Sequence, residues 1–176
     1  KERWALWRIS APWAKVYSRD FLVNNQILFY DSKMGEDIYF NIIAFSLCNK
    51  YVTINYSGYN YLDNTLSVSN TFQTMESDQA SPCPMLMDGF RKICVIGKNR
   101  IQYVEYFYIR YIVWYIFFRA KHVGSSIALK NYDEAMGLLK TLFPSHMKNS
   151  LLRPCKPTEE EIHIRLFVWF IMIMKQ

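Results

Sequence analysis

The chain has 176 residues, which is enough for one domain with a hydrophobic core and leaves little room for a second independent domain. It is 51% hydrophobic and 17% aromatic, which excludes an intrinsically disordered chain and favours large buried or ligand-facing surfaces. The formal net charge of +6 suits an anionic partner, whether a nucleic acid, a sugar nucleotide or a lipid headgroup, without choosing among them.

The cysteines and the N-terminus indicate a cytosolic setting. Cys48, Cys83, Cys94 and Cys155 contain no Cys-x-x-Cys pair, so reduced thiols are expected and a structural metal is not. Lys1–Trp4 shows neither a signal peptide nor an initiator methionine, so we expect a part of a longer polypeptide or a processed chain.

Neither of the long apolar segments is predicted to span a bilayer. Ile101–Phe118 carries Gln102, Glu105 and Arg110, and Leu166–Met174 has nine residues. Peripheral contact with the inner face of the cytoplasmic membrane stays open.

The first part of the chain is predicted to mix strands with helices. Lys15–Leu22 is expected to form a short helix or turn, and Ile27–Tyr30 a strand. A helix over Glu36–Cys48 follows, because Gly35 lets the backbone turn and apolar residues recur at helical spacing. Tyr51–Asn55 and Tyr59–Leu62 have the composition of two further strands, joined by a turn. The pattern predicts an α/β (α+β) fold.

The second part is predicted to be helical. The polar, proline-containing stretch Thr71–Pro84 indicates a linker or lid, so we divide the chain into residues 1–75 and residues 76–176. The expected helices cover Leu86–Ile96, Arg100–Lys121, Tyr132–Phe143 after an Asn131 cap, and Thr158–Met174 after a capping box formed by Thr158 and Glu161. The aromatic Arg100–Lys121 segment indicates the centre of a small bundle, with a membrane-facing surface as the alternative.

Glu36 and Asp37 are the strongest candidates for catalytic residues in the sequence. Acids in the first turn of a helix lie near its positive end, where one of them can point at a ligand while the helix holds it still. The other interpretation is that the pair only caps the helix as solvated charge. On these two residues alone both interpretations remain open, and the cap is the commoner case.

Three segments in order resemble the back half of a family-2 glycosyltransferase of the bacterial polysaccharide type, which has a GT-A fold. Pro12–Leu22 reads Pro-Trp-Ala-Lys-Val-Tyr-Ser-Arg-Asp-Phe-Leu and is similar to the family's Trp-x-Lys-hydrophobic-Tyr-x-Arg segment. Gly35–Phe40, following Ile27–Phe29, is similar to its Glu-Asp motif. Tyr59–Tyr61 and Ser67–Asn70 are similar to its Tyr-x-Tyr and Ser-hydrophobic-Ser stretch.

The resemblance implies an inverting transfer of a sugar from a nucleotide-sugar donor to a saccharide or lipid-linked acceptor. In that scheme Asp37 is the general base, Glu36 is an orienting or acceptor-binding neighbour, and Trp13 forms part of the acceptor wall. The family also implies a divalent cation, Mn²⁺ or Mg²⁺, for which this chain offers no Asp-x-Asp ligand before the Glu-Asp motif. By resemblance, residues 1–75 are the acceptor side of the domain, and the chain alone is not expected to be a competent transferase.

Other classes of function remain as alternatives. The strongest is a non-catalytic membrane-surface or protein-binding module, in which the basic charge and the aromatic helices act and Glu36 and Asp37 only cap a helix. Nucleic-acid binding is disfavoured because Lys and Arg are scattered along the sequence. A histidine-based enzyme is disfavoured because His122, His146 and His163 have no Ser or Cys nucleophile signature nearby.

Overall fold

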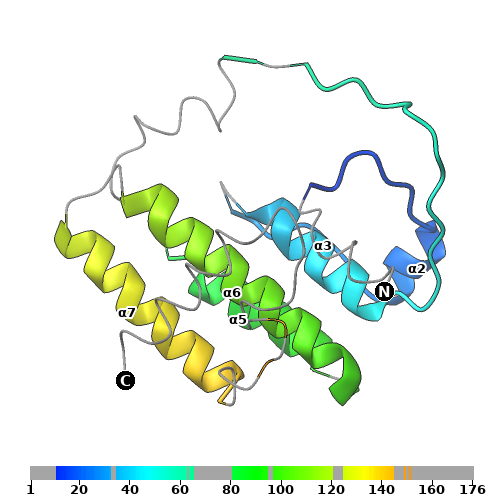
Figure 1. Cartoon of the computed structure of the whole chain (residues 1–176). Helices are drawn as coiled ribbons and strands as arrows, with labels where there is room; N and C mark the ends of the chain where they lie inside the picture. Colours follow the sequence, from blue (N-terminus) through cyan, green and yellow to red (C-terminus); the bar gives the residue numbers. More distant parts are fainter. Residues whose placement is uncertain are drawn as a thin grey trace.

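The structure is a computed structural model that describes residues 11–32, 35–62, 64–65, 81–94, 97–144, 149 and 151, without the side chains of 98–99, 117–120 and 125. In order along the chain its helices are α2 (Arg19–Asn24), α3 (Glu36–Leu47), α5 (Cys83–Ile93), α6 (Lys98–Ala120) and α7 (Ser125–Leu142). In Figure 1, α6 lies between α7 and α3. The helix α5 packs against both α3 and α7, so α3, α5, α6 and α7 form a bundle.

The α/β (α+β) prediction, with a GT-A-like domain in the first part of the chain, is wrong for the described residues, which form helices and no strand. Ile27–Tyr30, Tyr51–Asn55 and Tyr59–Leu62 lie outside any helix or ladder. Their β-branched and aromatic composition fits a pleated surface, but a strand forms only where a neighbouring strand completes its backbone hydrogen bonds. The described chain supplies no such neighbour, and Val52 is left 88% exposed.

The short helix α2 starts later than the composition predicts. Ser18 lies in an extended conformation before it, and its hydroxyl accepts a hydrogen bond from the backbone N–H of Phe21 at 3.3 Å. This is the geometry of a serine N-cap, which satisfies one of the N–H groups that the first turn leaves without a partner. The cap therefore sets the helix start at Arg19 and leaves Lys15 in the preceding irregular segment.

The helix predicted from Glu36 is confirmed as α3, and it is more deeply enclosed than a helix that docks on a sheet. Residues on all sides of it are buried: Ile38, Tyr39, Phe40, Asn41, Ile42, Ile43, Ala44 and Ser46. The buried amide of Asn41 is satisfied because its Oδ1 atom accepts a hydrogen bond from the hydroxyl of Tyr17 at 2.9 Å. At the far end, the Arg100 guanidinium donates to the carbonyl of Ser46 at 3.1 Å and to Oδ1 of Asn49 at 3.2 Å, which ties the end of α3 to α6.

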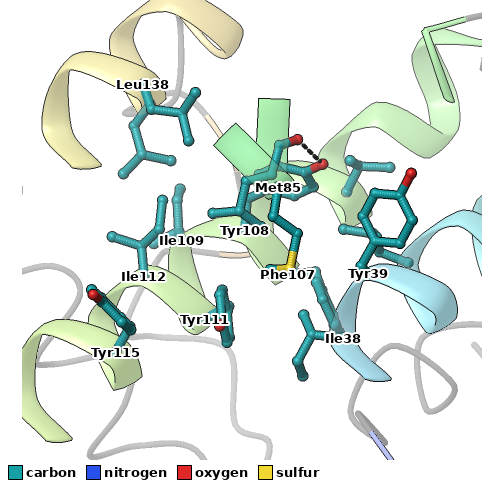
Figure 2. Close-up of a cluster of buried hydrophobic side chains, with 14 of the residues drawn as sticks. Ile38, Tyr39, Met85, Phe107, Tyr108, Ile109, Tyr111, Ile112, Tyr115 and Leu138 are labelled. Carbon is teal, nitrogen blue, oxygen red and sulfur yellow. Dashed lines mark hydrogen bonds between the residues drawn. The ribbon is translucent and has the colours of Figure 1, made fainter. Parts of the chain in front are cut away.

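The aromatic helix α6 is the centre of the bundle, as one of the two interpretations of its sequence predicts. The buried aromatic residues along its described part are Tyr106, Phe107, Tyr108, Tyr111 and Tyr115. Figure 2 shows Tyr108 and Tyr111 facing Ile38 and Tyr39 of α3, with Met85 of α5 between the two helices. The hydroxyl of Tyr108 donates to the carbonyl of Leu86 at 2.8 Å, so burial of this ring leaves no unsatisfied phenol.

The helices α5 and α7 both begin earlier than predicted. Pro84 stands in the first turn of α5, where its missing N–H costs no helical hydrogen bond, so the helix starts at Cys83. Asn131 lies inside α7 and does not cap it. The residues before it include the strong helix formers Ala128 and Lys130, and the Lys130 ammonium lies 4.0 Å from the Glu134 carboxylate one turn on.

Several predictions fall outside the described residues. These are the helix over Thr158–Met174 with its Glu161 capping box, the stretch Ser67–Asn70, and most of the linker that contains the division between residues 75 and 76. The division stays a prediction. Where the chain is described, α3 from the first part shares one core with α5, α6 and α7 from the second.

No helix in the described portion is both long enough and apolar enough to cross a membrane.

Candidate functional site

The candidate site is built on the start of α3. Gly35 precedes the helix with a left-handed backbone (φ 86°), a conformation that glycine adopts without steric cost. The glycine has no side chain to cap the helix, and Glu36 and Asp37 occupy the first turn. Both acids are half-buried. The sequence prediction of a glycine turn followed by two acids at the positive end of a helix is therefore confirmed.

One oxygen of the Asp37 carboxylate is hydrogen-bonded to the backbone of its own helix. Its Oδ1 atom accepts a hydrogen bond from the backbone N–H of Ile38 at 2.7 Å, which satisfies one of the N–H groups left open in the first turn. The cap interpretation thus describes a real contact. A carboxylate has two oxygens and about four lone-pair positions, so the hydrogen bonds from the backbone N–H groups of Ile38 and of Asp37 itself leave acceptor capacity for an incoming hydroxyl.

The surroundings of Asp37 raise its pKa. Burial is the largest cause, and the negative charge of Glu36 adds to it, while the Ile38 N–H and the positive charge of Lys15 act in the opposite direction. A carboxylate with a raised pKa is a stronger proton acceptor than an ordinary surface aspartate. The arrangement can therefore hold a carboxylate that takes a proton from a weakly acidic hydroxyl.

Lys15 is a functional candidate that the sequence reasoning missed. Its ammonium donates hydrogen bonds to the carbonyls of Ala11 and of Trp13, the latter at 3.4 Å, and lies 5.8 Å from the centre of the Phe45 ring of α3. Burial lowers the pKa of Lys15, and the Asp37 charge opposes that effect. The signal was present in the Trp-x-Lys segment, where Lys15 follows Trp13, the residue expected in the acceptor wall, by two positions.

The backbone beside Lys15 is strained. Ala14 has φ 57°, in the left-handed region that costs a residue with a Cβ atom roughly 1–2 kcal/mol. This conformation turns the chain sharply between Trp13 and Lys15. Residues held in such a conformation gather at functional sites, where the surrounding contacts maintain them.

Trp13, the third predicted site residue, lies against two tyrosines from the segment that follows α3. Its ring stacks on Tyr59 with centroids 5.1 Å apart and planes 10° apart, and it meets Tyr61 at 5.5 Å and 37°. We call Trp13, Tyr59 and Tyr61 the aromatic platform. The Tyr-x-Tyr spacing is visible in the sequence, but its contact with Trp13 depends on how the chain returns past α3.

The four functional candidates form two groups joined through Lys15. Glu36 and Asp37 lie together on α3, and Trp13 lies in the aromatic platform. Lys15 bonds to the carbonyl of Trp13 and its charge acts on the Asp37 carboxylate.

Contacts beneath the site hold α3 in place. The Tyr17 ring meets the edge of Phe40 at 5.2 Å, and Phe29 stacks on the same ring at 4.4 Å. Burial raises the pKa of the Tyr17 hydroxyl to about 12, so it stays protonated and donates to Asn41 at neutral pH. The hydroxyl of Tyr39 donates to the Asp88 carboxylate of α5 at 2.5 Å. These bonds fix the helix that carries Asp37 on both of its flanks.

The described residues do not fit the divalent metal that the family resemblance implies. Nowhere among them do three His, Cys, Asp or Glu side chains come together as a metal ion requires. The carboxylate of Asp37 instead has the Lys15 ammonium as its nearby positive charge. We derive no step through a metal.

Comparison of the chain with models of protein families, with curated proteins and with solved structures finds no match in any of the three.

Proposed function

We propose that this chain supplies the acceptor side of an inverting glycosyltransferase, which moves a sugar from a nucleotide-sugar donor to a saccharide acceptor in surface polysaccharide synthesis. The observation that carries the proposal is the half-buried Asp37 carboxylate, which lies in the first turn of α3 and has a raised pKa that the charge of Lys15 only partly offsets. The order of the sequence segments that resemble family-2 glycosyltransferases supports it.

In the proposed reaction Asp37 is the general base. One of its oxygens accepts the proton of an acceptor hydroxyl while the hydroxyl oxygen attacks the anomeric carbon of the donor sugar. The bond from that carbon to the nucleotide breaks on the opposite face, and the nucleotide leaves with the electron pair. Configuration at the anomeric carbon is therefore inverted, and the proton remains on Asp37 until water removes it.

Two further residues have roles in this proposal. Glu36 orients the acceptor by accepting a hydrogen bond from a neighbouring hydroxyl, and its charge keeps the pKa of Asp37 high. Trp13 forms part of the acceptor wall, since an aromatic face can cover the C–H face of a sugar ring. By the same resemblance, the reaction takes place in the cytoplasm at the inner face of the membrane, where lipid-linked acceptors are elongated.

The test is sugar-nucleotide turnover by the natural polypeptide that contains this sequence, measured with Mn²⁺ or Mg²⁺ and common nucleotide sugars. We expect Asp37→Asn to lower kcat by roughly 10²- to 10⁴-fold, the usual contribution of a positioned general base. Asp20→Asn is the matched control, because Asp20 is an exposed acid in the first turn of another helix, α2. Turnover indifferent to Asp37, or no turnover with any donor, would remove the base assignment.

A non-catalytic binding module is the second candidate, and one observation favours it. The segment after α3 exposes large apolar side chains at alternating positions: Val52 is 88% exposed and Ile54 is 75% exposed. Exposed apolar surface of this kind marks contacts with proteins or membranes. Binding to anionic vesicles that is unchanged in Asp37→Asn, together with absent turnover, would favour this candidate.

A further inference from the structure

The aromatic platform joins two segments that lie on either side of α3 in the sequence. Trp13 precedes the helix, and Tyr59 and Tyr61 follow it. The near-parallel stacking of Trp13 on Tyr59, together with the tilted contact with Tyr61, brings three large rings to one place. Offset stacking of this kind is worth about 0.5–1.5 kcal/mol for each pair beyond the area that it buries.

The rings of the platform stay in contact with solvent, unlike most aromatic rings of the bundle. Trp13 is 43% exposed, Tyr59 48% and Tyr61 64%, whereas Tyr39 of α3 is 2% exposed and Tyr108 of α6 is fully buried. Packing in the core therefore does not account for this cluster. Because Trp13 and Tyr59 cover one face of each other, the three rings present their outer faces and edges to solvent.

The side chain of Lys15 relates the platform to the candidate base. Ala14 holds the strained left-handed turn directly after Trp13, and the Lys15 ammonium donates to the carbonyl of Trp13. The same ammonium acts electrostatically on Asp37. A ligand on the platform would thus contact the segment that carries Lys15, whose charge acts on the Asp37 carboxylate.

We propose that the aromatic platform is a saccharide subsite that takes a pyranose ring of the acceptor, with Tyr59 and Tyr61 binding it together with Trp13. This inference rests on the proposed function. A pyranose offers an apolar C–H face, which can pack on the exposed outer face of an aromatic ring, and hydroxyls, which the phenol groups of tyrosines can bind. Exposed Trp and Tyr rings also lie at membrane surfaces, so binding to lipid vesicles is the alternative that the binding experiment separates from saccharide binding.

The test is saccharide binding without a donor, by the natural polypeptide that contains this chain. Cellotetraose, chitotetraose and maltotetraose are the probes, and affinity is measured by ligand-observed NMR titration. We expect Trp13→Ala, Tyr59→Ala and Tyr61→Ala each to weaken binding by about two- to tenfold. Tyr59→Phe, which keeps the ring, should retain most of the affinity.

Tyr56→Ala is the matched control, because Tyr56 is a 78% exposed tyrosine of the same segment. It should bind the three saccharides as the unaltered protein does. Binding of none of them, or equal binding by the platform variants and by Tyr56→Ala, would overturn the subsite. Loss of binding to phosphatidylglycerol vesicles in the platform variants, without any saccharide binding, would assign the surface to lipid and also overturn it.

The two proposals fail separately. Asp37→Asn should keep saccharide affinity while it loses transfer, and Tyr59→Ala should raise the acceptor KM with little change in kcat. If transfer depends on Asp37 but saccharide affinity ignores the platform, the subsite alone is wrong. If saccharide affinity depends on the platform but transfer ignores Asp37, the base assignment alone is wrong.

Discussion

A Cβ atom placed on Gly35 would come within 2.6 Å of the hydroxyl oxygen of Tyr111, so the residue that starts α3 is fitted directly against α6. The same added Cβ atom would lie 2.9 Å from the methyl carbon of Met85 in α5. Glycine is therefore required at position 35 for two reasons: the backbone there is left-handed, and the space between α5 and α6 leaves no room for a side chain. The position of Asp37, two residues later, depends on both.

Gly35→Ala should destabilise the fold. The left-handed backbone alone costs alanine roughly 1–2 kcal/mol, and displacement of Tyr111 and Met85 adds to this. Equilibrium unfolding in urea measures the change. Gly137→Ala in α7 is the control, since nothing lies within 4 Å of its Cβ position, and it should stabilise the helix by about 0.5–1 kcal/mol. Equal stability of Gly35→Ala and the unaltered chain would contradict the close fit.

Ala14→Gly should stabilise the fold or leave it unchanged, against the usual direction of this substitution. Glycine removes the left-handed strain of roughly 1–2 kcal/mol, while the greater conformational entropy that it gives the unfolded chain costs about 0.4–1 kcal/mol, so the net gain in stability is between zero and about 1.6 kcal/mol. Ala128→Gly inside α7 should lose about 1 kcal/mol. Thermal unfolding of the two variants checks the difference in sign, and a loss of similar size in both would mean that Ala14 is not strained.

Tyr39→Phe should lower stability by roughly 1.5–3 kcal/mol, because it removes a hydrogen bond to the Asp88 carboxylate between α3 and α5. Asp88→Asn should cost less, since the amide oxygen can still accept from the Tyr39 hydroxyl. Urea unfolding of both variants and of the double variant gives the coupling energy. Additive losses would show that the two groups do not interact.

Asp37→Asn should raise stability at neutral pH. Burial raises the pKa of the folded-state carboxyl above its ordinary value of 3.8, so the folded state holds this proton more tightly than the unfolded state does. The contribution of Asp37 to stability therefore falls as pH rises from 3.8 through the folded-state pKa. Asparagine has no such charge and can still accept from the Ile38 N–H. The gain, measured by urea unfolding, should shrink below pH 4; a gain that is constant with pH would contradict the raised pKa.

Local signals predicted the start of α3 correctly. Gly35 before two acids and an apolar run places the helix at Glu36 in the sequence and in the structure. The span of α6 was also predicted within about two residues at either end, since its aromatic run has no internal breaker. The start of α7 was missed because Asn131 has the composition of a cap, while helix formers before it extend the helix to Ser125.

The strand predictions failed because a strand depends on a partner that local composition does not reveal. Val52 and Ile54 alternate as a half-buried strand would, and both are exposed. The contacts of Trp13 with Tyr59 and of Lys15 with the Trp13 carbonyl were missed for a related reason. Each depends on the path of the chain around α3 or on the left-handed Ala14, and neither leaves a periodic pattern in the sequence.

The rate of sugar transfer by Asp37→Asn, compared with the unaltered natural polypeptide at equal folded fraction, tests the central claim most directly. The account predicts a fall of roughly 10²- to 10⁴-fold in a variant that is at least as stable at pH 7 as the unaltered protein. Transfer at the unaltered rate by this variant would contradict the role of Asp37 as the base and leave its carboxylate as a cap of α3.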